Sequence, residues 1–373
     1  MVGLQILLIL LLRSGSVQEF LGRKVAQAIE ARTGARTEVR RVDLRALNGL
    51  TASDVLMFDC QGDTLLQSSR LSMNVDVLPL LRGRLVISSA QLFGPYVRLN
   101  RPTADAPLNA QFIIDALSSD NDGQSSPVDL QIRSLIIRRG HLVYDQSDSP
   151  LTSGGFDARH VDLNDISAHF ILNRLCADSI DFHLKRLSFR EQSGLDIKSL
   201  SFHLKANPTK ASLERFSLSL PQSTLQMDLH AAYESTEGHL VDSTMMLSGR
   251  AFDTRITPSD LSPFASVLKD LNVPFAVSSS ITSQGKETLD IETLKVSSDN
   301  GFVLETSGLM THVLSKPQFY AHVHTLSVTS DFLASLDDHG IELPSALLRV
   351  GDMGYTGTVG GGTTGEHLLA GIE

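Results

Sequence analysis

The stretch from Arg70 to Val77 reads RLSMNVDV, and its alternation decides the fold class. Leu71, Met73, Val75 and Val77 alternate with polar residues, and a period of two places them on one face of a β-strand. Fully burying a Leu, Met or Val side chain contributes roughly 1.5–3 kcal/mol. The four residues together would therefore contribute about 6–12 kcal/mol when covered. This strand predicts a sheet with one polar and one apolar face.

The same alternation recurs along the chain, in about a dozen segments by the usual strand criteria. Turn residues separate the segments, as at Asn207-Pro208 and Asp299-Asn300-Gly301. We expect the apolar rows of these segments to join Leu71, Met73, Val75 and Val77 in one apolar surface. The further candidate residues are Val97, Leu99, Val128, Leu130, Ile132, Ile180, Phe182, Leu184, Leu200, Phe202, Leu204, Leu225, Met227 and Leu229.

Helical patterns are scarce after the first part of the chain. Short helices are predicted near 108–117, 258–271 and 330–336. A parallel α/β fold needs a helix after each strand, so antiparallel strands are favoured. The openings ITPSDL (Ile256–Leu261) and SVTSDF (Ser327–Phe332) resemble each other, which suggests a modular array. The periodicity leaves a barrel, a sandwich and an open trough as alternatives.

The N-terminus differs from the rest in its periodicity. Met1 to Leu12 reads MVGLQILLILLL, which is shorter than a full membrane span and lacks the flanks of a secretory signal. We expect residues 1–15 to be a partial membrane anchor and residues 16–34 to form an amphipathic helix. Ser16 is the expected cap and Gly34 the expected stop. A first β segment is then predicted at 35–145, and further β segments at 146–373.

Composition and motifs argue against most kinds of chemistry. The net charge of −10 disfavours nucleic acid as a partner. The chain has no G-x-S-x-G, HExxH or phosphate-binding glycine loop, so we expect no enzyme, no cofactor and no catalytic residue. His322 and His324 are too few for a closed metal site, so no metal is expected. Cys60 and Cys176 could pair in an oxidising compartment, but free thiols are the favoured prediction.

A family resemblance rests on the segment from Leu50 to Asp115. Its motifs are QGDTLL (Gln61–Leu66), ISSAQLFG (Ile87–Gly94) and PLNAQFIID (Pro107–Asp115), around the Leu71–Val77 row. In series they resemble the N-terminal part of TamB-type translocation and assembly module proteins, of the AsmA-like group, in a version similar to that of Bacteroidota. The resemblance extends through nearly the whole chain, although each motif is weak by itself.

The resemblance implies a mainly β fold in which a long, curled antiparallel sheet forms an apolar trough. It implies one N-terminal anchor in a bacterial inner membrane, with the bulk of the chain in the periplasm. Phospholipid acyl chains would be the ligands, and phospholipid transport or outer-membrane protein assembly and secretion the function. A C-terminal part would contact a BamA-like outer-membrane barrel. We expect this chain to be an N-terminal fragment, because residues 359–373 are glycine-rich and suggest no closing strand.

Two other functions remain open from the sequence. An all-β periplasmic or surface module, such as an adhesin-like sandwich, would bind sugar or protein without carrying lipid. Sugar binding usually needs exposed aromatic rings, yet the chain has no Trp and only 5 Tyr. A β-helical enzyme acting on polysaccharide would need a cluster of catalytic residues, and the sequence shows none. The acyl-chain scaffold is therefore the favoured prediction.

Overall fold

A computed structural model of the chain describes 23, 26–27, 29–31, 33–45, 49–75, 85–118, 128–152, 154–176, 179–236, 239–240, 244–285, 287–338, 344, 349, 351–364 and 367–372. Strand residues make up 65% of it, which confirms the mainly β prediction. The strands form one mixed sheet that is not closed, so the barrel is excluded. Among the described residues the other sheet is a two-stranded pair, β11 (Ser235–Thr236) and β12 (His239–Leu240), so no second large sheet makes a sandwich.

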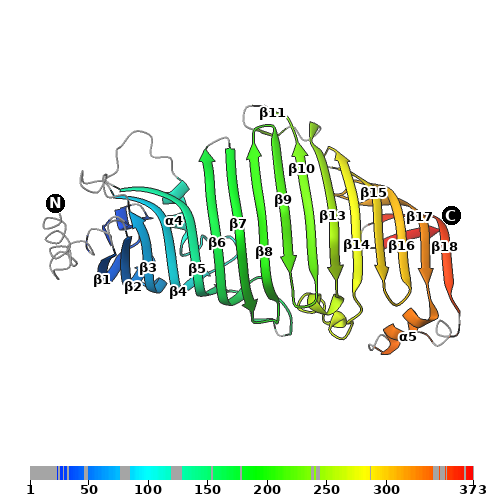
Figure 1. The fold of residues 1–373 in the computed structure, drawn as a ribbon, viewed down its shortest axis with the longest axis horizontal. Helices are drawn as coiled ribbons and strands as arrows, with labels where there is room; N and C mark the ends of the chain where they lie inside the picture. Colours follow the sequence, from blue (N-terminus) through cyan, green and yellow to red (C-terminus); the bar gives the residue numbers. More distant parts are fainter. Residues whose placement is uncertain are drawn as a thin grey trace, which may run out of the picture. The chain divides into compact units, whose positions relative to one another are not determined.

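The chain divides into two compact units, which we describe separately (Figure 1). Unit 1 comprises residues 1–172 and 186–194, and unit 2 comprises residues 173–185 and 195–373. The division therefore falls along β6 (His160–Cys176) and β7 (Ser179–Glu191). The boundary predicted at 145/146 lies inside a single strand, β5 (Val128–Gln146).

Unit 1 contains a parallel strand pair that the antiparallel prediction did not include. β1 (Thr37–Arg45), β2 (Gly49–Phe58), β3 (Thr64–Val75) and β4 (Leu85–Arg101) pair antiparallel in chain order. β4 and β5 then run parallel, while β5 and β6 are antiparallel again. Parallel neighbours need a crossover, and this one carries the helix α4 (Gln111–Ser118), close to where a helix was predicted.

The core of unit 1 lies under the first strands. Leu71 and Met73 are only 9% and 4% exposed and pack in this core. Its other buried members are Val42, Leu50, Ala52, Val55 and Ala90. Ile29 packs against the core from the N-terminal helix, whose described residues end at Thr33. Gly34 ends that helix as predicted, with φ at +70° and its N–H donating to Glu30 O at 2.7 Å.

Unit 2 is an antiparallel array. Its strands, with part of β7, are β8 (Asp196–Asn207), β9 (Lys210–Ser219), β10 (Thr224–Ala232), β13 (Met246–Ile256), β14 (Phe275–Gln284), β15 (Thr288–Ser298), β16 (Phe302–Thr311), β17 (Gln318–Val328), β18 (Met353–Thr364) and β19 (His367–Ile372). The glycine-rich segment that suggested no closing strand thus forms the second half of β18 and all of β19. The prediction failed because glycine lacks the side chain that carries the alternation.

Two helical connections lie at the same end of the unit 2 strands (Figure 1). The helix predicted near 258–271 is two 3₁₀ turns, η2 (Pro258–Leu261) and η3 (Ser266–Leu268). The helix predicted near 330–336 is confirmed as α5 (Ser330–Asp338). Leu271, Val273 and Phe332 from these connections form the second core cluster.

Alternate strands of unit 2 carry one extra residue each. The extra residue lies between apolar-face residues three apart: Leu213 and Phe216, Ala251 and Thr254, Ile291 and Leu294, Val323 and Leu326. These are β-bulges, which restore the side-chain alternation beyond them. At two of them a non-glycine residue adopts a left-handed conformation, Arg215 at φ 53° and Asp253 at φ 45°.

The predicted membrane anchor at residues 1–15 lies outside the described residues. Within the described part of the chain, no helix combines the length and the hydropathy that a membrane span requires.

Candidate functional site

One face of the unit 2 sheet gathers the predicted apolar rows. We call it the apolar face, meaning the side that carries Leu200, Phe202 and Leu204 and the residues opposite them in the neighbouring strands. Directly opposite residues in an antiparallel pair share a face. Leu218, opposite Leu200, is also opposite Leu225 of β10. The strand register therefore brings the separate rows of β8 and β10 onto one surface.

The register extends this surface through the later strands of unit 2. Met227 lies opposite Ala251, which lies opposite Ser279. The same face continues through Leu294 and Thr306 to Val323. The apolar face is therefore continuous from β8 to β17.

An aromatic ladder crosses the first strands of the apolar face. The ring centroids of Phe182 and Phe202 are 5.9 Å apart, and those of Phe202 and Phe216 are 6.4 Å apart. Both distances are within the range of favourable aromatic pairs. Phe182 belongs to β7, so the ladder also joins the predicted row of Ile180, Phe182 and Leu184 to this surface.

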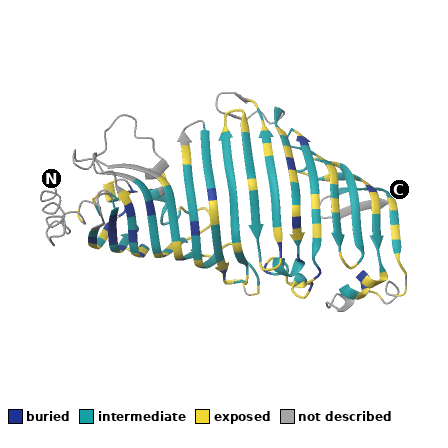
Figure 2. Cartoon of the chain, in the orientation of Figure 1, coloured by how far each residue is buried: buried dark blue, intermediate teal, exposed yellow. Residues whose placement is uncertain are grey.

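The side chains of the apolar face on β8, β9 and β10 are half-buried. This class includes every predicted residue on β8 and β10: Leu200, Phe202, Leu204, Leu225, Met227 and Leu229. Each of these residues therefore keeps part of its surface accessible to solvent. Figure 2 shows this half-buried class over most of unit 2, whereas buried residues gather on the first strands of unit 1. The apolar face of these strands is therefore available to a ligand.

Several candidate residues do not line an accessible surface. Leu71 and Met73 are packed in the core of unit 1, and Leu184 is 2% exposed. We correct the expectation that these three face a ligand, because their own chain covers them. Ile180, Phe182, Val97 and Leu99 are half-buried. Val77, and the side chains of Val75, Val128, Leu130 and Ile132, lie outside the described residues.

Sequence analysis missed the row of β9. Leu213, Phe216 and Leu218 belong to the apolar face, but the bulge at Arg215 places two residues, and not one, between the first two. A strict period of two cannot find such a row. The three-residue step within an otherwise alternating strand is the signal that would have identified it.

The opposite side of the unit 2 sheet, which we call the polar face, holds a bonded network. Arg215 donates to His203 Nδ1 at 3.1 Å, so this nitrogen is an acceptor. His203 Nε2 then carries the proton and donates to Asp181 Oδ1 at 2.7 Å. The His183 ring stacks on His203 with centroids 5.0 Å apart. The network crosses three strands, and its side chains are hydrogen-bonded to or stacked on one another.

Three groups of this network and its surroundings have shifted pKa values. Hydrogen bonds from Asn173 and then His203 lower the pKa of Asp181. The bond from Lys205 lowers the pKa of Glu214. Burial is the main cause that lowers the pKa of His183, which favours the neutral ring. All three shifts accompany structural pairing, so none of them indicates a catalytic acid or base.

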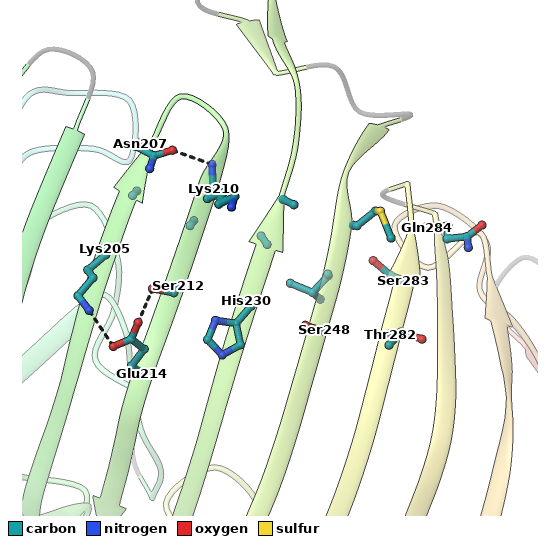
Figure 3. A pocket seen from close by; sticks show the side chains of 16 residues that line it. Lys205, Asn207, Lys210, Ser212, Glu214, His230, Ser248, Thr282, Ser283 and Gln284 are labelled. Carbon is teal, nitrogen blue, oxygen red and sulfur yellow. Dashed lines mark hydrogen bonds and ion pairs between the residues drawn. The ribbon is translucent and has the colours of Figure 1, made fainter.

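A shallow depression lies beside this network at the ends of β8, β9, β10, β13 and β14 (Figure 3). Its volume is about 710 Å³. Lys205 donates to Glu214 Oε2 at 2.9 Å, and Ser212 donates to the other carboxylate oxygen at 3.1 Å. His230 and Ser248 also line it (Figure 3). Lys205 and Glu214 neutralise each other, and the other charged side chain of the lining is that of Lys210.

The described residues assemble no group of three or more His, Cys, Asp or Glu side chains that could hold a metal ion. His322 and His324 contact each other with ring centroids 4.7 Å apart, and His324 Nε2 lies 2.8 Å from the Ser307 hydroxyl. Cys60 is a free, exposed thiol, and the side chain of Cys176 lies outside the described residues.

The chain was compared with known protein families, curated proteins and solved structures. No protein-family model, no curated protein and no solved structure matches the chain.

Proposed function

We propose that the chain is a non-enzymatic scaffold whose apolar face binds the acyl chains of phospholipids. The observation that carries the proposal is the continuous apolar face of unit 2, whose side chains on β8, β9 and β10 are half-buried. A large apolar surface on a folded protein usually marks a binding site. Hydrocarbon suits a long aliphatic surface that carries few polar groups.

The resemblance to TamB-type proteins gives this scaffold a cellular setting. Residues 1–15 would attach the chain to a bacterial inner membrane, and the bulk would lie in the periplasm. The scaffold would serve phospholipid transport to the outer membrane, or outer-membrane protein assembly and secretion. A BamA-like barrel would be its partner at the outer membrane.

Photo-crosslinking in cells tests the proposal with a matched pair of positions. Met227 and Gln226 are neighbours on β10, and both are half-buried, but they point to opposite faces. A photoreactive residue at Met227 should capture phospholipid, whereas one at Gln226 should not. Capture of protein alone at Met227 would favour the adhesin-like alternative. Equal capture of lipid at both positions would show that contact with lipid does not depend on the apolar face.

A further inference from the structure

The apolar face is covered by its own chain at one end. Phe275 begins β14, Phe302 begins β16, and both pack against the cluster formed by Leu271, Val273 and Phe332. The ring centroids of Phe302 and Phe332 are 5.1 Å apart, those of Phe275 and Phe302 are 5.8 Å apart, and those of Phe275 and Phe332 are 6.1 Å apart. We call these three rings the aromatic cluster. It covers the end of the face with protein, while the surface beyond it remains half-buried.

Hydrogen bonds fix α5, which supplies Phe332, in this position. Thr329 Oγ1 donates to Asn300 O at 3.0 Å and accepts from the Phe332 N–H at 3.2 Å. The Ser330 N–H donates to Asp352 Oδ1 at 3.0 Å. Gly301 approaches so closely that a Cβ there would collide with Thr329. The cluster is therefore built into the fold and does not need a ligand to form.

The connection between β13 and β14 is held in a similar way. Ser223 donates to Asp260 Oδ2 at 2.6 Å, and the Thr257 N–H donates to Ser223 Oγ at 2.9 Å. Asp260 also accepts from the Gln222 N–H at 2.9 Å. The end of this connection is tied back to its start, because the Ser259 N–H donates to Leu271 O at 3.0 Å, and Leu271 and Val273 pack with the aromatic cluster. Two connections with similar sequences thus cover the same end of the apolar face.

The strand length sets the room that remains. On β16 the apolar face runs from Leu304, next to the cluster, to Met310 near the far end. These residues are six positions apart, which corresponds to about 20 Å along a strand. That distance is comparable to an extended long-chain acyl group. An alkyl chain lying along the strands would meet Phe302 with its end, and Phe332, which is only 6% exposed, supports Phe302 from behind.

We propose that the aromatic cluster is the end wall of the hydrocarbon-binding face and that Phe332 limits the length of the alkyl chain bound there. This inference rests on the proposed function, because it presupposes that the apolar face binds hydrocarbon. It adds an orientation, with the alkyl chain parallel to the strands, and a residue that determines specificity.

Displacement of a fluorescent fatty acid by saturated fatty acids of increasing length tests the proposal on the full chain. For the wild type, affinity should rise with length and then reach a plateau. In Phe332→Ala the plateau should move to longer chains, because each methylene that finds new apolar room gains about fourfold in affinity. Phe332→Leu should give a smaller shift in the same direction. Leu333→Ala is the matched control: Leu333 is also 6% exposed and lies on the same helix.

The outcomes separate the two proposals. If the wild type binds no fatty acid, the proposed function itself fails. If the wild type binds but the folded Phe332 variants keep its plateau, hydrocarbon binds without an end wall and only the inference is overturned. A plateau shifted equally by Leu333→Ala would also overturn it, because general loosening of α5 would then explain the change. Circular dichroism establishes which variants fold. If Phe332→Ala does not fold, Leu336→Ala replaces it, because Leu336 packs against the core cluster of Leu271, Val273 and Phe332.

Discussion

Met73 and Met227 occupy equivalent places in the sequence but different environments in the fold. Each lies in the middle of an alternating row with an apolar residue two positions away on either side. Met73 is 4% exposed within the core of unit 1, whereas Met227 is half-buried on the apolar face of unit 2. Replacing each by Ala therefore measures whether the apolar face is packed or accessible.

The expected magnitudes differ because a cavity forms in one case alone. Met73→Ala leaves a closed void next to Leu50 and Ala90, so it should cost about 2–5 kcal/mol. Met227→Ala removes side-chain atoms that are only partly withdrawn from water, and no enclosed cavity remains. Scaling the transfer value by partial burial gives a cost of about 1–1.5 kcal/mol. Against a typical stability of about 5–15 kcal/mol, both variants should fold.

Native-state hydrogen exchange is the suitable assay, because it reports the opening free energy of each segment separately. The amides of β3 should lose protection strongly in Met73→Ala, and those of β10 modestly in Met227→Ala. Adding fatty acid to the wild type should raise protection of the β10 amides but leave that of the β3 amides unchanged. Equal losses at the two sites would refute the reasoning, because they would show that Met227 is as tightly packed as Met73.

Three further predictions concern the scaffold. The backbone N–H groups of Arg159 and Thr152 hold the pKa of Asp157 well below its usual value of 3.8. The ionised carboxylate therefore stabilises the fold above about pH 4, and this contribution is lost on acidification. Asp157→Asn should make the urea midpoints at neutral pH and at about pH 3 more alike. A Cβ at Gly308 would meet the backbone of Tyr320 and Ala321, so Gly308→Ala should cost about 1–3 kcal/mol in urea unfolding, whereas Gly354→Ala, whose nearest contact would be 3.6 Å away, should cost much less. Because the pKa of His183 is lower in the folded state, the unfolded chain binds a proton at this ring more readily, and stability should fall as pH drops below about 6.5. His183→Asn should reduce that fall, as measured by thermal unfolding.

Periodicity predicted the elements of this fold better than their surroundings. The rows of β8 and β10 were found because each alternates without interruption, and their common face follows from the register. Alternation reports which side of a strand is apolar, but not what covers that side. Leu71 and Met73 were placed on the ligand surface because the residues that bury them, such as Ile29, are distant in sequence.

Other differences arose where the sequence carries a weak local signal. The parallel pairing of β4 and β5 depends on a crossover that short-range pattern does not reveal. The glycine-rich strand β18 has few side chains to alternate, so its pairing with β17 could not be read from apolar spacing. The aromatic cluster joins residues from three separate elements, and only the repeated Thr-Pro-Ser-Asp and Thr-Ser-Asp openings marked the segments that build it.

The bulges on alternate strands also determine which changes in strand length the sheet can absorb. On β9 the extra residue separates Leu213 from Phe216 and keeps both on the apolar face. Deleting Arg215 would leave Leu213 and Phe216 two residues apart, so a regular strand would still carry both on the apolar face. Deleting Asp228 from β10, which has no extra residue there, would instead invert one half of that strand, so that polar side chains would face the hydrocarbon. Removing two residues from the strand end would merely shorten it. Related sequences should therefore differ in these strands by even numbers of residues, or by gaining or losing a whole bulge.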